Sequence, residues 1–173
     1  MNRPTRPAII LVGPMGAGKS TVGRCLAECL RLDFYDTDTE LELRCGADIP
    51  WIFDIEGEGG FRRRETEVLS ELVHRPNTIL ATGGGIVLAP ENRALMRQSV
   101  AVIYLTASVD DLYKRVAKDK GRPLLQVEDP ESTYRAIFNQ RDPLYREVAN
   151  HIITTNNVTA PTKVARNIVD LLG

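Results

Sequence analysis

The sequence predicts an α/β fold in which a parallel sheet is covered by helices on both faces. Short, continuous apolar runs alternate with longer segments whose apolar residues recur at helical spacing. This alternation implies right-handed crossovers between parallel strands. The chain has 173 residues, 43% of them apolar and 26% charged. We therefore expect one ordinary domain spanning residues 1–173.

The first half of the chain is expected to supply three strands. These runs are Ala8–Val12, Asp33–Asp38 and Thr78–Thr82, with helices from about Lys19 to Arg31 and from Gly60 to His74. The first run is apolar throughout, which is typical of a strand buried on both faces. After the second strand, Thr39 is the expected cap of another helix, which Gly46 and Pro50 would interrupt.

The second half continues the same alternation. Strands are expected at Val100–Leu105 and His151–Thr155, and helices at Glu91–Gln98, Val109–Lys118, Pro130 to about Gln140, and Thr162–Leu172. Ser108 is the predicted N-cap of the second of these helices. Lys120–Asp129 contains Gly121 and Pro123 and is expected to be a loop.

Composition excludes several classes of protein. The net charge is -1, from 22 basic and 23 acidic side chains, so no general field would attract nucleic acid. The three cysteines show no disulfide pattern, and Cys25 and Cys29 are expected to be buried thiols on one helix face. No apolar run is long enough to span a bilayer. The basic segment Met1–Pro7 lacks a signal-peptide core. We expect a reduced, cytoplasmic protein without a membrane or nucleic-acid partner.

The segment Gly13–Ser20 reads GPMGAGKS and satisfies the P-loop pattern G-x-x-x-x-G-K-[ST]. A buried strand precedes it and an amphipathic helix follows, as this motif requires. The backbone N–H groups from Gly16 to Thr21 are expected to surround the phosphates of ATP. Lys19 would reach the β- and γ-phosphates, and Ser20 would ligate Mg²⁺. Hydrolytic switches and motor ATPases share this loop, so it identifies only the phosphoryl donor.

Asp36 and Asp38 end the second predicted strand. Residues two apart on a strand point the same way, so both carboxylates would face the phosphates. One of these carboxylates would support Mg²⁺ through water, and the other would accept a hydroxyl proton from an acceptor. The alternative is that the two acids only cap the following helix.

A basic cluster follows in the sequence Phe61-Arg62-Arg63-Arg64-Glu65. Arg62 and Glu65 are three residues apart and share a helical face, so Glu65 would hold Arg62 rigid for a substrate carboxylate. The alternative is an ordinary surface ion pair. Arg63 and Arg64 lie on other faces and are expected to be solvated.

Further candidates lie at a strand end and in later segments. The triple glycine from Gly83 to Gly85 permits close backbone approach to a ligand, although a tight turn explains it equally well. Arg122 in the loop would neutralise charge on the transferring phosphoryl group, and Arg115 would lie against adenine. Arg141, expected just after a helix, would make a second carboxylate contact. A surface salt bridge is the alternative for each arginine. His74 and His151 have no ligand spacing and are interpreted as structural.

Several motifs occur together in a specific order. They are GPMGAGKST, DTD at Asp36–Asp38, EGEGGFRRRE ending at Glu65, GGG at Gly83–Gly85, GRPLL at Gly121–Leu125 and RDPLY at Arg141–Tyr145. Over essentially the whole chain this set resembles the shikimate kinase family. The resemblance implies sheet order 2-3-1-4-5, a substrate-binding segment near residues 39–68, a lid near 118–129, and a monomer.

The resemblance also implies ATP-dependent phosphorylation of the shikimate 3-hydroxyl, with Mg²⁺ as cofactor. By position, Asp38 is similar to the residue that holds the reacting hydroxyl. Lys19 and Arg122 are similar to the pair that stabilises charge at the phosphoryl group. The implied shikimate contacts are Asp38, Arg62, Glu65, Gly83, Gly84, Gly85 and Arg141. The implied nucleotide contacts are Gly16, Ala17, Gly18, Lys19, Ser20, Thr21, Arg115, Arg122 and Val158, and the implied metal side is Ser20 and Asp36.

Two other kinds of function remain as alternatives. A gluconate kinase or an adenylate kinase would use the same donor loop, although few aromatic residues are available near Arg62 to bind a second base. A nucleotide-sensing module without turnover would not need an intact set of Lys19, Asp38 and Arg122. The resemblance favours shikimate over both.

Overall fold

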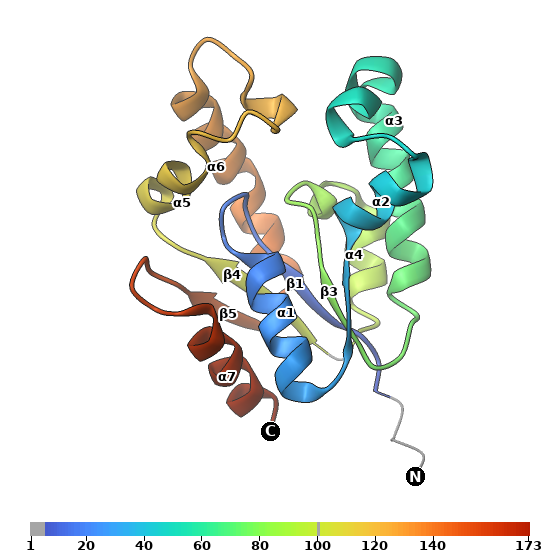
Figure 1. The fold of residues 1–173 in the computed structure, drawn as a ribbon, viewed down its shortest axis with the longest axis vertical. Coiled ribbons are helices and arrows are strands. Elements are labelled where there is room, and N and C mark those ends of the chain that lie inside the picture. The colour runs from blue at the N-terminus through green and yellow to red at the C-terminus, as the bar shows by residue number, and fades with distance from the viewer. Residues whose placement is uncertain (1–5, 100) are drawn as a thin grey trace.

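Five parallel strands form the central sheet, in the order β2-β3-β1-β4-β5 (Figure 1). The strands are β1 (Ile9–Val12), β2 (Asp33–Asp36), β3 (Thr78–Ala81), β4 (Ala101–Thr106) and β5 (His151–Thr154). The computed structural model describes residues 6–99 and 101–173. The predictions for the first five residues and for Val100 lie outside that range. The predicted fold class and strand order are confirmed.

Helices connect the strands and cover both faces of the sheet (Figure 1). They are α1 (Lys19–Leu30), α2 (Thr37–Cys45), α3 (Ile49–Leu72), α4 (Pro90–Met96), α5 (Val109–Val116), α6 (Pro130–Val148) and α7 (Pro161–Leu172), with short 3₁₀ turns η1 (Ile86–Leu88) and η2 (Pro123–Leu125). The side chain of Ser108 caps α5 by accepting a hydrogen bond from Asp111 N, as predicted.

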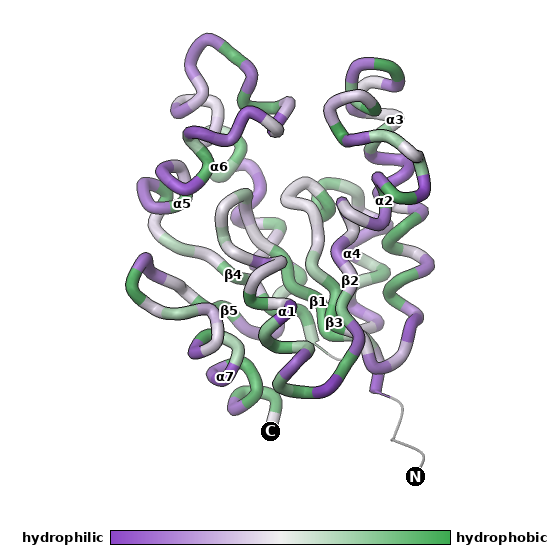
Figure 2. Tube along the Cα trace, viewed as in Figure 1, coloured by the Kyte–Doolittle hydropathy of each residue, from purple (hydrophilic) through white to green (hydrophobic). Residues whose placement is uncertain are grey.

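The sheet separates two hydrophobic cores. Alternate residues of β1 point to opposite faces, so Ile9 and Leu11 pack with α1, α5 and α7, whereas Ile10 and Val12 pack with α3 and α4. Apolar residues accordingly concentrate along the strands (Figure 2). Helix α6 contributes to both cores.

The junction between β2 and α2 differs from the prediction. Strand β2 ends at Asp36, so Asp38 lies in the first turn of α2 and the shared strand face inferred for the two acids is wrong. Asp36, rather than Thr39, is the N-cap: its Oδ1 accepts from Asp38 N at 3.0 Å and from Thr39 N at 3.2 Å. A short acidic side chain that satisfies two free helix N–H groups stops the strand at this point.

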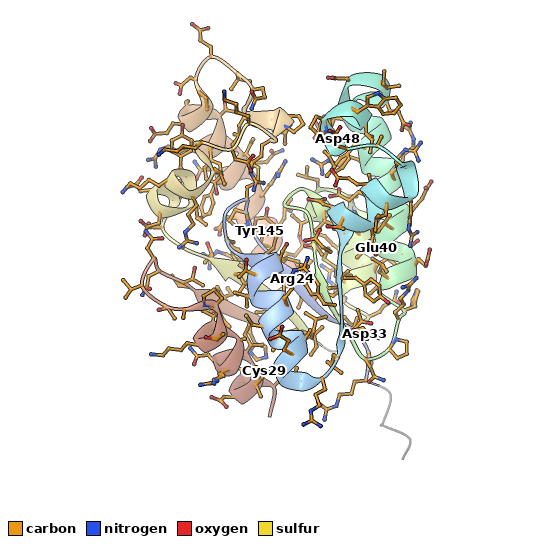
Figure 3. The ribbon with its side chains drawn as sticks, viewed as in Figure 1. Arg24, Cys29, Asp33, Glu40, Asp48 and Tyr145 are labelled. Atoms are coloured by element: carbon orange, nitrogen blue, oxygen red, sulfur yellow. The ribbon has the colours of Figure 1, made fainter. Side chains whose placement is uncertain are left out.

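Two helices are longer than predicted. Helix α3 begins at Ile49, with Asp48 as its N-cap (labelled in Figure 3) and Pro50 in its first turn, where the missing N–H costs nothing. It contains a kink at Gly57. Helix α6 continues past Gln140 through Pro143, so Arg141 lies inside the helix rather than after it.

The predicted burial of the two helical cysteines and the predicted solvation of Arg64 are also wrong. Cys29 is exposed on α1 (Figure 3), and Cys25 is only partly buried. Arg64 is not simply solvated, because its guanidinium pairs with Glu56. Among the described residues, no helix is long and apolar enough to cross a membrane.

Candidate active site

The loop between β1 and α1 forms one wall of the site. Gly16 and Gly18 have φ angles of 86° and 84°, a conformation that side-chain-bearing residues rarely adopt. A Cβ on Gly13 would lie 2.2 Å from the carbonyl oxygen of Leu105, so only glycine fits there. Lys19 Nζ donates to the carbonyl oxygens of Gly13 (2.7 Å) and Pro14 (2.9 Å) at the mouth of the loop.

Asp36 connects the loop to α2. Its Oδ2 accepts a hydrogen bond from the Ser20 hydroxyl, while its Oδ1 caps α2. The Asp36 carboxylate therefore caps α2 and contacts Ser20 at the same time. Ser20 and Asp36 place two hard oxygen donors side by side, which is the donor chemistry that Mg²⁺ prefers.

Asp38 and Lys19 lie together in the interior of the site and titrate abnormally. Burial, together with the neighbouring Asp36 and Glu65 carboxylates, raises the pKa of Asp38 to about 7, although Lys19 opposes the shift. Burial lowers the pKa of Lys19 to about 8, against the attraction of Asp38. Each group therefore changes charge near neutral pH.

A pocket opens beside Asp38. One side of the pocket is formed by α2 and the start of α3, and the opposite side by the segment that contains η2. These two parts face each other above the sheet in Figure 1. The polar lining of the pocket is Asp38, Arg62, Glu65, Arg122 and Arg141, together with the backbone of Gly83, Gly84 and Gly85. The structure thus brings the predicted acceptor residues to one cavity.

Arg62 and Glu65 form the predicted ion pair, with 2.9 Å between Arg62 Nη1 and Glu65 Oε2. Arg62 Nη2 also meets Glu58 Oε1 at 3.1 Å. Glu65 is 1% exposed, so this pair is not an ordinary surface contact. Burial raises the pKa of Glu65, and the Arg62 guanidinium opposes that shift.

Arg141 is buried and faces the same cavity from α6. Burial is the main cause that lowers its pKa, although Tyr145 and Glu65 oppose the shift. Its Nε and the Oε1 of Glu65 have no hydrogen-bond partner among the described residues. A buried guanidinium and a buried carboxylate oxygen with unused bonding capacity are suited to a polar ligand.

The triple glycine runs against these side chains. A Cβ on Gly83 would lie 2.7 Å from Asp38 Oδ1 and 2.8 Å from Glu65 Oε1, and one on Gly85 would lie 2.2 Å from Arg62 Nη1. The glycines therefore allow close approach by the protein's own side chains, and their contact with a ligand stays a prediction.

Sequence reasoning missed the residues that position the glycine loop. The amide of Gly83 donates to Thr37 Oγ1 at 3.0 Å, and the hydroxyl of Tyr145, which lies in the interior (Figure 3), donates to the carbonyl oxygen of Gly84. It also missed the apolar wall formed by Ile49, Phe53 and Phe61. The apolar run at residues 51–53 was the available signal for that wall.

A second pocket lies on the other side of the P-loop, between Arg115 and the start of α7. Arg115 donates to the carbonyl oxygen of Gly16 (2.9 Å) and to Asn157 Oδ1 (3.0 Å). Asn156 Oδ1 accepts from the amides of Val158 (3.0 Å) and Thr159 (2.8 Å), which shapes the loop. Val158 is 92% exposed and lies outside the pocket lining.

A third pocket joins these two spaces. Lys19, Ser20 and Asp36 line it, and Asp38, Gly83, Gly84 and Arg122 line both this pocket and the one beside Arg62. Arg122 is paired with Asp119 at 2.9 Å. Asp38 and Arg122 therefore stand at the junction between the P-loop and the arginine-lined cavity.

The sequence profile that matches this chain describes shikimate kinase, and the match covers residues 15–173. The chain belongs to the shikimate kinase family. The resemblance predicted from the ordered motifs is thereby confirmed, and the kinase name places the chain among the phosphotransferases.

Individual shikimate kinases are closely similar to this chain in sequence and in structure. The chain is 54% identical over 164 residues to a shikimate kinase of Nitrosospira multiformis, and the aligned region covers 95% of this chain and 84% of the relative. It is 56% identical over 156 residues to one from Acinetobacter baylyi, covering 90% and 87% of the two chains. A shikimate kinase of Acinetobacter baumannii, solved in complex with shikimate, superposes with a TM-score of 0.93 at 52% identity, covering 96% and 93%.

A gluconokinase from Sinorhizobium meliloti is a more distant neighbour. It superposes with a TM-score of 0.56 at 15% identity and so shares the fold alone. Gluconate kinase was one of the alternatives left open by the motifs. The family match of the shikimate kinases is far stronger.

Proposed function

We propose that this protein transfers the γ-phosphoryl group of ATP to the 3-hydroxyl of shikimate, giving shikimate 3-phosphate and ADP for aromatic amino acid biosynthesis. The observation that supports this most strongly is the position of Asp38. It is partly buried where the P-loop pocket meets a cavity whose lining includes Arg62 and Arg141. A hydroxylated carboxylic acid would place its carboxylate on the arginines and its hydroxyl at Asp38.

Arg62 and Arg141 are the proposed carboxylate contacts. Arg62 is oriented by Glu58 and Glu65, and Arg141 is buried with its Nε unpaired. A planar guanidinium binds a carboxylate through two parallel hydrogen bonds, which fixes the acceptor's orientation as well as its affinity. Glu65 and the glycine loop would lie around the remaining hydroxyl groups of the acceptor. This arrangement supports a small, anionic acceptor rather than a nucleotide base.

Asp38 is the proposed base. Its carboxylate would accept the proton of the acceptor hydroxyl as that oxygen forms a bond to the γ-phosphorus. The bond from the γ-phosphorus to its bridging oxygen breaks, and ADP leaves. A pKa of about 7 suits this role, because a large fraction of the carboxyl groups is ionised near neutral pH and the carboxylate still binds a proton readily.

Lys19 and Arg122 are the proposed charge-stabilising pair. Lys19 Nζ already lies at the mouth of the P-loop, where phosphate oxygens would replace the neutral carbonyl acceptors of Gly13 and Pro14. Arg122 reaches the junction from the segment 118–129, the proposed lid. Their positive charges would act on the negative charge that the transition state spreads over the phosphoryl oxygens.

Ser20 and Asp36 are the residues that would hold Mg²⁺ with the nucleotide. Their adjacent oxygens fit a hard cation that usually takes only one or two protein ligands beside phosphate and water. When bound, the ion would neutralise charge on the phosphates. The remaining proposed nucleotide contacts, Gly16 to Thr21 and Arg115, line the P-loop and adenine-side pockets. For Val158, whose N–H already donates to Asn156 Oδ1, the proposed contact is through its backbone rather than its side chain.

The site suits a single chain. We propose that residues 1–173 act as one domain and as a monomer, with residues 39–68 as the substrate-binding segment. All the groups assigned to the reaction come from one copy. Free thiols at Cys25, Cys29 and Cys45 are consistent with a reducing, cytoplasmic setting.

A phosphoryl-transfer assay tests the proposal. ADP release is measured with ATP and Mg²⁺ in the presence of shikimate, gluconate or AMP, and the product is identified by mass. We expect turnover with shikimate, at least about 100-fold lower kcat/KM with the other two, and loss of activity on chelation that added Mg²⁺ restores. Preference for gluconate or AMP would replace the acceptor assignment. ATP binding without ADP release would favour a nucleotide-sensing module.

A further inference from the structure

The kink in α3 is bridged by an ion pair that the reaction does not use. Arg64 meets Glu56 through two hydrogen bonds, from Nε to Oε2 at 2.8 Å and from Nη2 to Oε1 at 2.6 Å. Helical ion pairs ordinarily join residues three or four apart. These two are eight apart, a rise of about 12 Å in a straight helix. The pair therefore depends on the bend between them.

Two glycines permit that bend. Gly57 has φ 69° and ψ 178°, a region that is essentially restricted to glycine. A Cβ on Gly60 would lie 2.4 Å from the Cβ of Glu56, so the stem of Glu56 rests against a residue without a side chain. We name Glu56, Gly57, Gly60 and Arg64 the hinge clasp.

The part of α3 before the clasp, residues 49–56, forms a short arm over the acceptor pocket. Ile49 and Phe53 line that pocket, and the Phe53 ring lies 4.8 Å from the Phe61 ring. At its far end the arm is tied to α2, because Ile49 N donates to Glu42 Oε1 at 3.0 Å. No arm residue lines the two pockets around the P-loop.

We propose that the Arg64–Glu56 ion pair is a positioning device that holds this arm against the acceptor pocket. Neither residue lines the pocket or contacts a reacting group. Loss of the pair would leave the arm in its binding position for a smaller fraction of the time, and apparent affinity falls in proportion to that fraction. The clasp would therefore set the affinity for the acceptor and leave the chemical step unchanged. This inference rests on the proposed function.

Steady-state kinetics of Arg64→Ala and Glu56→Gln provide the first test. We expect KM for shikimate to rise about three- to tenfold, the scale of a well-formed but partly exposed pair, with kcat and KM for ATP unchanged. The double variant should be no worse than either single variant, because both remove the same contact. Arg63→Ala, which removes an exposed neighbouring charge, is the matched control and should leave all three constants unchanged. Additive effects, or equal changes in both KM values, would overturn the proposal.

The chain also contains its own probe of the arm. Trp51 is the single tryptophan, and it lies on the arm with 52% of its surface exposed. Without ligand, Arg64→Ala should increase acrylamide quenching of its fluorescence, and saturating shikimate should remove the difference. Identical quenching together with an unchanged KM would overturn the clasp. A wild-type protein that does not phosphorylate shikimate would instead overturn the proposed function, and ligand-free quenching would still test the clasp.

Discussion

The phosphate-binding part of the nucleotide side is one contiguous segment, the P-loop, whereas the acceptor side draws on α2, α3, the glycine loop and α6. On the nucleotide side the main groups are backbone amides in a glycine-rich turn, with Lys19 and Ser20 adjacent in sequence. On the acceptor side they are side chains that line one cavity, namely Asp38, Arg62, Glu65 and Arg141, of which Glu65 and Arg141 are buried and the other two partly buried. A backbone cradle tolerates changes in nearby side chains. A cluster of buried charges does not, because each group depends on its partners.

Asp38→Asn should have the largest effect, because this residue serves both sides. We expect turnover to fall by about 10²- to 10⁴-fold as the base is lost, with ATP binding retained. Single-turnover phosphoryl transfer and nucleotide titration measure the two quantities. Near-normal turnover would remove Asp38 from the chemistry.

The same substitution should stabilise the ligand-free protein. The folded state binds the Asp38 proton more tightly than the unfolded chain, since the pKa rises from 3.8 to about 7. The contribution of this carboxyl to stability is thus complete below pH 3.8 and is lost as pH rises through about 7. At pH 8, Asp38→Asn should raise Tm, by about 2–4 °C for each 1 kcal/mol regained. At pH 4 the gain should shrink, and an equal gain at both pH values would show that charge burial is not the cause.

Arg62→Ala should have the next largest effect, and it should affect the acceptor side without affecting the nucleotide side. It removes a proposed carboxylate contact and leaves Glu65 buried without its partner. We expect shikimate binding to weaken by about 30-fold or more, corresponding to 2 kcal/mol or more, with ATP affinity retained. Calorimetry with each ligand measures this, and Arg63→Ala is the control. Unchanged shikimate affinity would show that the cluster is only a structural ion pair.

The pH dependence of kcat/KM should report the groups at the junction of the two sides. Activity should rise as Asp38 ionises near its pKa of about 7 and fall as Lys19 loses its proton near its pKa of about 8. Because the groups interact, the two apparent pKa values belong to the pair. A narrow bell-shaped profile is therefore expected, with each limb falling tenfold per pH unit well beyond its pKa. A flat profile from about pH 6 to pH 9 would contradict this assignment.

Asn157→Ala should have the smallest effect, on the nucleotide side alone. It removes one of the two hydrogen bonds that orient Arg115, and the Gly16 carbonyl keeps the other. We expect KM for ATP to rise about two- to fivefold, with shikimate binding unchanged. Val158→Ala is the matched control, because the only contact proposed for Val158 is through its backbone. An equal rise in that control would instead assign its side chain to the nucleotide site.

The errors in prediction lie mainly where segments meet. A helix cap and a strand end compete at Asp36, and local sequence did not decide between them. The start of α3 was missed because Pro50 was interpreted as an interruption, whereas it lies in the first turn of a helix that bends at Gly57. The pairing of Arg64 with Glu56 depends on that bend, so the spacing of residues in the sequence did not reveal it.

The sequence by itself determined the α/β class, the P-loop and the Arg62–Glu65 pair. These features rest on periodicity, on a contiguous motif and on the turn of one helix, all of which are local. Only the tertiary structure decided that Asp38 stands between the two pockets, that Arg141 is buried beside Glu65, and that Thr37 and Tyr145 fix the glycine loop. Each of these contacts joins residues far apart in the chain, and their burial is what shifts the pKa values on which the proposed chemistry depends.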